Sequence, residues 1–98
     1  MTDVFDGKTA VVTGGTSGIG YAVSEELLKR GATVWVIGSR KESVLKAKAS
    51  LAAYKNARFM AVDVTVADEV KRMIDTCTKE SGRIDYLFNN AGIGMTHP

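Results

Sequence analysis

Residues 11–20 read VVTGGTSGIG, and this stretch decides how the chain folds. Two β-branched residues run into four glycines and three hydroxyl side chains, and a helical pattern then begins. Glycine lets the backbone adopt positive φ and approach a ligand closely. The N-terminus of the following helix presents free N–H groups and the positive end of its dipole. We therefore expect a strand–turn–helix unit that binds an anion such as a pyrophosphate.

The rest of the chain alternates between strand-like and helix-like segments. Short β-branched or apolar runs predict strands at 8–13, 33–37, 58–62 and 84–88. Apolar residues at helical spacing predict three helices between them, with stripes formed by Ile19, Ala22, Val23 and Leu27, by Val44, Ala47 and Leu51, and by Val66, Val70, Met73, Ile74 and Cys77. The order β-α-β-α-β-α-β predicts an α/β fold. We expect the first half of a Rossmann-type doubly wound parallel sheet, with the fourth strand beside the first.

Helix ends are predicted from local signals. Ser39 with Glu42 and Thr65 with Asp68 are N-cap patterns at the starts of the second and third helices. A glycine follows the first helix and another follows the third, as is typical of helix C-termini.

Composition indicates one small globular domain, because 45% of the 98 residues are hydrophobic and 24% are charged. A net charge of +2 is too weak to favour nucleic acid or an anionic membrane as a partner. The N-terminus has no basic-then-apolar leader, and no apolar run approaches the ~18 residues of a membrane span. The single cysteine, Cys77, excludes an intrachain disulfide and a cysteine zinc cluster. These features favour an intracellular, cytoplasmic protein, and we predict no metal site.

Three glycine-loop patterns compete for the turn. The P-loop requires Lys and then Ser or Thr after its last glycine, but Tyr21 follows Gly20. The ordinary dinucleotide fingerprint G-x-G-x-x-G fits in no register. The pattern T-G-x-x-x-G-x-G is satisfied in full by Thr13, Gly14, Gly18 and Gly20.

With this third pattern the chain resembles the short-chain dehydrogenase/reductase family, classical type. Val62-Asp63-Val64 follows the third strand, where that family's Asp contacts the adenine. Asn89-Asn90-Ala91-Gly92 follows the fourth strand and matches the family's N-N-A-G motif. The resemblance extends from about Phe5 to Gly92. It implies that residues 1–98 are the N-terminal part of a single NAD(P)-binding Rossmann domain, and that the parent protein moves hydride between the cofactor and a carbonyl or alcohol substrate.

The resemblance also implies which residues hold the cofactor. The glycine turn would bind the pyrophosphate, the residues after the second strand the 2′-phosphate, those after the third the adenine, and those after the fourth the ribose region. The predicted cofactor-binding residues are Thr13, Gly14, Thr16, Ser17, Gly18, Ile19, Gly20, Ser39, Arg40, Asp63, Val64, Asn90, Ala91 and Gly92.

The end of the second strand bears on the choice between NADP and NAD. An NAD site places Asp or Glu there, about 20 residues past the glycines, but this chain reads Gly38-Ser39-Arg40-Lys41. A guanidinium can hold a 2′-phosphate in bidentate fashion, which favours NADP(H). Two observations leave NAD open. Ser17 stands where many NADP-using relatives carry a basic residue, and Arg40 and Lys41 would also suit the solvated first turn of a helix.

The family's catalytic groups are a Ser and a Tyr-x-x-x-Lys pair, and the 98 residues contain no such pair. Tyr21, Tyr54 and Tyr86 are each followed at that spacing by a residue other than lysine. In the family these groups, the substrate loop and the helices of the dimer or tetramer lie after the fourth strand. We therefore predict no catalytic residue here. We expect the cofactor-binding half of a homo-oligomeric enzyme, inactive alone, whose fourth strand has a bare apolar edge.

Two other interpretations remain. The chain could be a non-catalytic, truncated dinucleotide-binding module. It could also belong to another Rossmann-type class such as the methyltransferases, although these usually carry an acidic residue at the end of the second strand. Trp35, Cys77 and the three tyrosines are predicted to be packing residues, and His97 a tail residue without a partner in the sequence.

Overall fold

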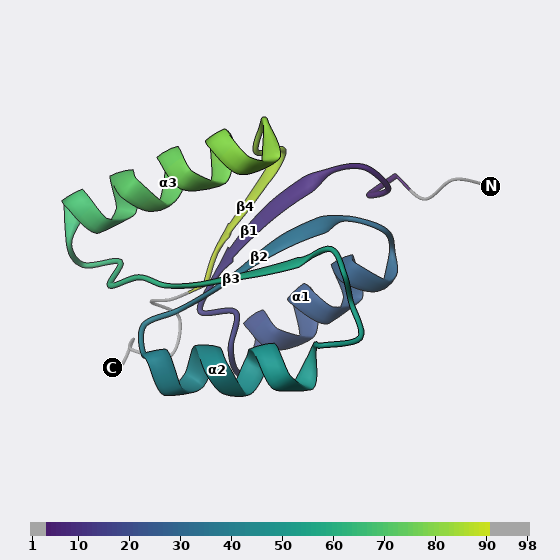
Figure 1. Ribbon diagram of the computed structural model, residues 1–98, viewed down its shortest axis with the longest axis horizontal. Coiled ribbons are helices and arrows are strands. Elements are labelled where there is room, and N and C mark those ends of the chain that lie inside the picture. The colour runs from purple at the N-terminus through teal and green to yellow at the C-terminus, as the bar shows by residue number, and fades with distance from the viewer. Residues whose placement is uncertain (1–3, 91–98) are drawn as a thin grey trace.

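Four parallel strands form one sheet in a computed structural model that describes residues 4–90 (Figure 1). The elements are β1 (Thr9–Thr13), α1 (Gly18–Lys29), β2 (Thr33–Gly38), α2 (Lys41–Ser50), β3 (Ala57–Ala61), α3 (Ala67–Ser81) and β4 (Tyr86–Asn89). The sheet order is β3-β2-β1-β4, so β4 lies beside β1 as predicted. The predicted alternation of strands and helices is confirmed.

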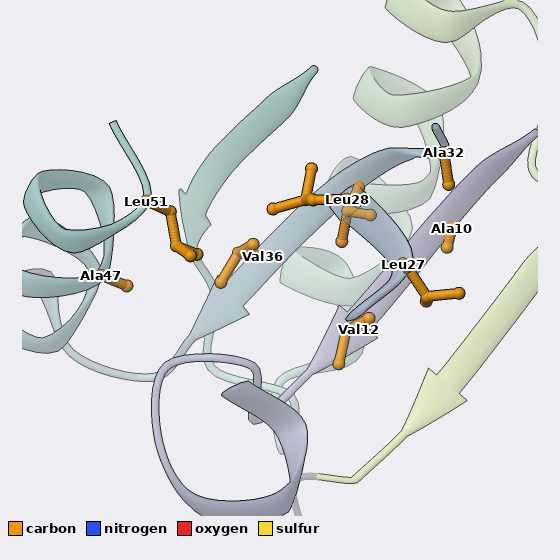
Figure 2. Packing of buried hydrophobic residues seen from close by; sticks show 9 residues of the cluster. Ala10, Val12, Leu27, Leu28, Ala32, Val36, Ala47 and Leu51 are labelled. Carbon is orange, nitrogen blue, oxygen red and sulfur yellow. The ribbon is translucent and has the colours of Figure 1, made fainter. Parts of the chain in front are cut away.

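Helices cover both faces of the sheet: α1 and α2 lie on one side and α3 on the other (Figure 1). Successive strand residues point to opposite faces, so Ala10 and Val12 of β1 belong to one hydrophobic cluster and Val11 to the other. Figure 2 shows the first cluster, where side chains from α1 and α2 pack over β1 and β2. Tyr21, Tyr54 and Tyr86 pack against this cluster, as predicted.

The second cluster packs α3 against the opposite face of the sheet. Trp35 is almost fully buried there, and its Nε1 donates a hydrogen bond of 2.9 Å to Ser81 Oγ. Cys77, on α3, is completely buried against the sheet. Burial raises the pKa of the Cys77 thiol to about 11, and the nearby Glu80 carboxylate adds to the rise. Both residues are therefore core residues, as the sequence predicts.

The buried face of α1 differs from the predicted stripe. Leu27 is buried, but Ile19 is 67% exposed and Ala22 is also exposed. Gly20 and Ser24 are buried instead, and Ser24 Oγ donates to the Gly20 carbonyl at 2.9 Å. The prediction was wrong here because the first turn of α1 packs its backbone against the preceding loop, which selects small residues rather than large apolar ones.

The predicted side-chain caps were also wrong. The N-cap residues are Arg40 for α2 and Val66 for α3, and neither forms a side-chain cap hydrogen bond. Each helix starts one residue later than its cap pattern implies. Thr65 instead donates its hydroxyl to Asp63, and Ser39 lies at the rim of a pocket described below.

The start of β4 is held to β1 by Asp85. Thr9 donates its N–H to Asp85 Oδ2 at 2.8 Å and accepts the Asp85 N–H at 2.8 Å. Arg83 adds an ion pair to Oδ2 at 3.1 Å. Within residues 4–90, β4 pairs with β1 alone, and its apolar residues Leu87 and Phe88 are 54% and 39% exposed.

Candidate functional site

A pocket of about 310 Å³ lies at the carboxyl edge of the sheet, where the segments after β1, β2 and β3 meet. In open parallel α/β sheets, ligands bind at this edge. The pocket is lined by Gly14, Thr16, Ser17, Ile37, Gly38, Ser39, Ser43, Val62, Asp63, Val64 and Thr65.

The glycine turn is shaped by positive φ angles and by a tight contact with α1. Gly14 has φ +64° and Gly18 has φ +59°, a region that glycine adopts without strain. Gly15 donates its N–H to the Ile37 carbonyl at 2.9 Å, which ties the turn to β2. A Cβ on Gly20 would collide with the Gly14 carbonyl oxygen. The spacing of the glycines therefore allows the turn to fold back onto the first turn of α1.

The end of β2 forms the second wall of the pocket. A Cβ on Gly38 would lie 2.6 Å from Thr16 Cγ2, so the absence of a side chain there lets the turn pack against β2. Ser39 and Ser43 present hydroxyl groups to the pocket. Arg40 is exposed and does not line the pocket, although it directly follows Ser39. The structure thus places Arg40 beside the pocket rather than within it.

The segment after β3 forms the third wall and contains a compact hydrogen-bond network. Val62 donates its N–H to the Gly38 carbonyl at 2.8 Å, which anchors the segment to β2. Asp63 Oδ1 accepts the Thr65 hydroxyl at 2.6 Å and the Thr65 N–H at 3.0 Å. These two bonds, the hydroxyl first, lower the pKa of Asp63, so its carboxylate is charged at neutral pH. Asp63 also donates its own N–H to Glu69 Oε1 at 2.9 Å.

The end of β4 joins the site through Thr13. Thr13 is buried, and its Oγ1 accepts the Asn90 N–H at 3.0 Å and lies 3.0 Å from Asn89 Oδ1, to which it can donate. A smaller hollow of about 240 Å³ lies between this strand end and the start of α1. It is lined by Val12, Ile19, Gly20, Val23, Phe88, Asn89 and Asn90.

The structure brings most of the predicted site residues together at one edge. Six of them line the larger pocket, three line the smaller hollow, and three more are described but line neither. The larger pocket contains Gly14, Thr16, Ser17, Ser39, Asp63 and Val64, and the smaller hollow contains Ile19, Gly20 and Asn90. Gly18 is the first residue of α1, Thr13 is buried at the end of β1, and Arg40 is exposed and follows Ser39 of the larger pocket. Ala91 and Gly92 lie outside the described residues.

Six residues of this region were missed by the sequence reasoning. Five of them line the pocket, namely Ile37, Gly38, Ser43, Val62 and Thr65, and Glu69 supports it from α3. Ser43 lies at the start of α2, so the predicted order of strand, loop and helix after β2 was the available signal for it. The role of Glu69 depends on a hydrogen bond back along the chain, for which the sequence carries no clear signal.

The glycine turn offers an anion neutral hydrogen-bond donors at its side of the larger pocket, whereas the Asp63 carboxylate at the other side would repel one. Among the residues that line the pocket, only Asp63 is charged. α1 begins at Gly18 and has no acidic residue in its first turn, so nothing there opposes the positive end of its dipole. Backbone N–H groups and the hydroxyls of Thr16, Ser17 and Ser39 are the available donors. A diphosphate group matches such a set.

Comparisons with known proteins agree with this architecture. The family model for the short chain dehydrogenases matches residues 8–98. An oxidoreductase, asL5, of Sarocladium schorii is 38% identical over 92 residues, which cover 94% of this chain and 36% of that protein. The structure of an NAD⁺-bound xylitol dehydrogenase superposes with a TM-score of 0.85 at 35% identity, covering 92% of this chain and 35% of that one. The Pseudomonas aeruginosa RhlG/NADP active-site complex superposes with a TM-score of 0.80 at 29% identity, covering 91% and 36%.

A Rossmann-like fold with its pocket at the carboxyl edge of a parallel sheet therefore has close structural counterparts. The chain belongs to the short-chain dehydrogenase family. It spans about a third of the length of the curated relatives it matches. In the part of the chain that the structure describes, no helix is long and apolar enough to cross a membrane.

Proposed function

We propose that this chain binds a nicotinamide dinucleotide as the first part of a Rossmann domain. The parent protein would transfer hydride between NADP(H) and a carbonyl or alcohol substrate. The observation that carries the proposal is the larger pocket, which is lined by both the glycine turn and the Asp63–Thr65 segment. Membership of the short-chain dehydrogenase family supports the same activity.

Each part of the cofactor has a set of candidate residues. The turn from Thr13 to Gly20 would hold the pyrophosphate, because α1 begins there and lacks an acidic first turn. Asp63 and Val64 would contact the adenine. Asn90, with Ala91 and Gly92, would close around the adenine ribose. Thr13 would contribute by holding Asn90 in place, since its hydroxyl accepts the Asn90 N–H.

NADP(H) is the favoured cofactor because the end of β2 lacks the acid that would bind free ribose hydroxyls. Gly38 has no side chain, and packing against Thr16 leaves little room for one. Ser39 and Ser43 supply hydroxyls in the pocket, and Arg40 lies next to it. One solved relative is in complex with NADP and another is bound to NAD⁺, and both are close in fold. The fold therefore does not distinguish the two cofactors, and the proposal for NADP(H) rests on the residues after β2.

Replacing Arg40 tests the cofactor proposal. Arg40→Ala should weaken NADPH binding about tenfold or more, since hydrogen bonds to charged groups contribute about 1.5–3 kcal/mol, and should change NADH binding little. Lys46→Ala, at an exposed position of the same helix, is the matched control. Titration calorimetry with both cofactors gives the comparison. Equal losses for the two cofactors would remove the NADP assignment, and failure of the wild type to bind either one would remove the dinucleotide proposal.

The isolated 98 residues should bind the cofactor without using it. They contain no Tyr-x-x-x-Lys pair, and a tyrosine near its free pKa of about 10 is a poor base at neutral pH without a neighbouring cation. A second candidate function, a stand-alone dinucleotide-binding module, is favoured by one observation: all residues that line the larger pocket lie between Gly14 and Thr65. If the pure chain oxidised NADPH with a panel of aldehydes and ketones, it would be neither inactive alone nor a module that only binds the dinucleotide.

A further inference from the structure

Glu69 connects α3 to the wall of the larger pocket. It lies in the first turn of α3, is half-buried, and its Oε1 accepts the Asp63 N–H at 2.9 Å. Glu69 does not line the pocket itself. A carboxylate is a strong acceptor for a backbone N–H, and its place near the helix N-terminus is electrostatically favourable. The bond therefore fixes the peptide between Val62 and Asp63 relative to α3.

The side chain of Asp63 is fixed separately by Thr65. Both Thr65 donors bind Oδ1. Asp63 Oδ2 has no hydrogen-bond partner among residues 4–90, and the Val64 N–H has none there either. The pocket wall thus retains one free acceptor and one free donor on consecutive residues. This pair complements a base edge that carries an exocyclic amine next to a ring-nitrogen acceptor, which is the Watson–Crick edge of adenine.

We propose that Glu69 is a positioning residue for adenine recognition: by holding the Asp63 N–H, it sets the orientation of the Asp63–Val64 acceptor–donor pair before the base binds. This inference rests on the proposed function, because it takes the ligand to be an adenine dinucleotide. The benefit is preorganisation, since a wall that is already ordered loses less conformational freedom on binding.

The test compares NADPH with its hypoxanthine analogue in the full 98-residue chain. Hypoxanthine replaces the 6-amino group by an oxo group and protonates N1, so it reverses the donor and acceptor at this edge. The wild type should prefer NADPH about tenfold, since each hydrogen bond contributes about 0.5–1.5 kcal/mol net. Glu69→Ala should reduce that preference several-fold. Glu69→Gln should retain most of it, because an amide oxygen still accepts the N–H.

The controls separate positioning from general stability. Asp68→Ala removes the neighbouring acid of the same turn, which makes no side-chain hydrogen bond to another described residue, and should leave the preference unchanged. Glu69→Asp keeps the charge but shortens the side chain, and replaces Glu69→Ala if the alanine variant does not fold. Equal weakening of both dinucleotides by Glu69→Ala would overturn the inference. A wild type that binds NADPH without distinguishing the bases would overturn adenine recognition alone, and one that binds neither would overturn the proposed function.

Discussion

Thr13 and Asn90 are joined by a hydrogen bond of 3.0 Å although they lie 77 residues apart in the chain. The Asn90 N–H donates to Thr13 Oγ1, and the same hydroxyl lies 3.0 Å from Asn89 Oδ1. The threonine that opens the glycine pattern thus connects the ends of β1 and β4. Thr13 therefore has a structural role, which does not depend on any contact between its side chain and a ligand.

Thr13→Val should therefore destabilise the chain although it preserves the shape of the side chain. The variant leaves the Asn90 N–H without its acceptor, and we expect a loss of about 1–2 kcal/mol in the free energy of unfolding. Thr13→Ser retains the hydroxyl and should lose less. Urea unfolding followed by circular dichroism measures both, and a valine variant as stable as the wild type would contradict this role.

Two glycines of the same turn should respond differently to alanine. At Gly20 an added Cβ would meet the Gly14 carbonyl oxygen and lie 2.8 Å from Asn90 Nδ2, so we expect a loss of roughly 1–3 kcal/mol or more. At Gly18 nothing lies within 4 Å of the Cβ, and only the positive φ opposes substitution, at a cost of about 1–2 kcal/mol. Gly18→Asn should recover part of this loss, whereas Gly20→Asn should not. A larger loss of stability at Gly18 than at Gly20 would contradict this packing of the turn.

Much of this fold follows from the sequence because the elements have strong local signals. Short β-branched or apolar runs predicted all four strands to within two residues, and Gly82 ends α3 with φ +83° as a C-terminal glycine should. The misplaced features depend on tertiary contacts. Ile19 is exposed because the backbone of the first turn of α1, rather than its large side chains, packs against the preceding loop. Thr65 donates its hydroxyl to Asp63 instead of capping the N-terminus of α3. No periodicity encodes either contact.

The same contrast applies to the site. The glycine pattern and the strand ends predicted which segments meet at the carboxyl edge, because parallel strands end on the same side. The sequence could not predict which side chains at this edge lie within a few ångströms of one another. It could not show that Arg40 lies beside the pocket, or that Glu69 supports the pocket wall from α3.

Asp85 should make stability depend on pH in acid. The hydrogen bond from the Thr9 N–H, with further contributions from Arg83, lowers the pKa of Asp85 below its usual value. Its stabilising effect is therefore fully present above the unfolded pKa of about 4 and is lost as the pH falls through the lower folded value. The difference in unfolding free energy between wild type and Asp85→Asn should shrink in that range. Asp75→Asn, at an exposed position of α3, is the control, and a difference independent of pH would contradict the account.

Cys77 should be unreactive in the folded chain. It is completely buried, and its pKa is raised to about 11, so both access and thiolate formation are suppressed. Thiol reagents at about pH 8 should modify it slowly in native protein and fully in denaturant. Because Cys77 packs in the cluster with Trp35 and Met73, its reaction rate reports opening of the α3 layer. Rapid labelling of native protein would show that α3 is not stably docked.

The central claim, that the carboxyl-edge pocket binds a nicotinamide dinucleotide, is tested most directly by following backbone amide NMR shifts during NADPH titration. We predict saturable shifts in the glycine turn, at Ser39 and across Asp63–Thr65. A hollow of about 380 Å³ near the start of β3, lined in part by Lys48, Tyr54 and Arg58, serves as an internal control and should not respond. Shifts confined to that hollow, or no saturable shifts at all, would contradict the account.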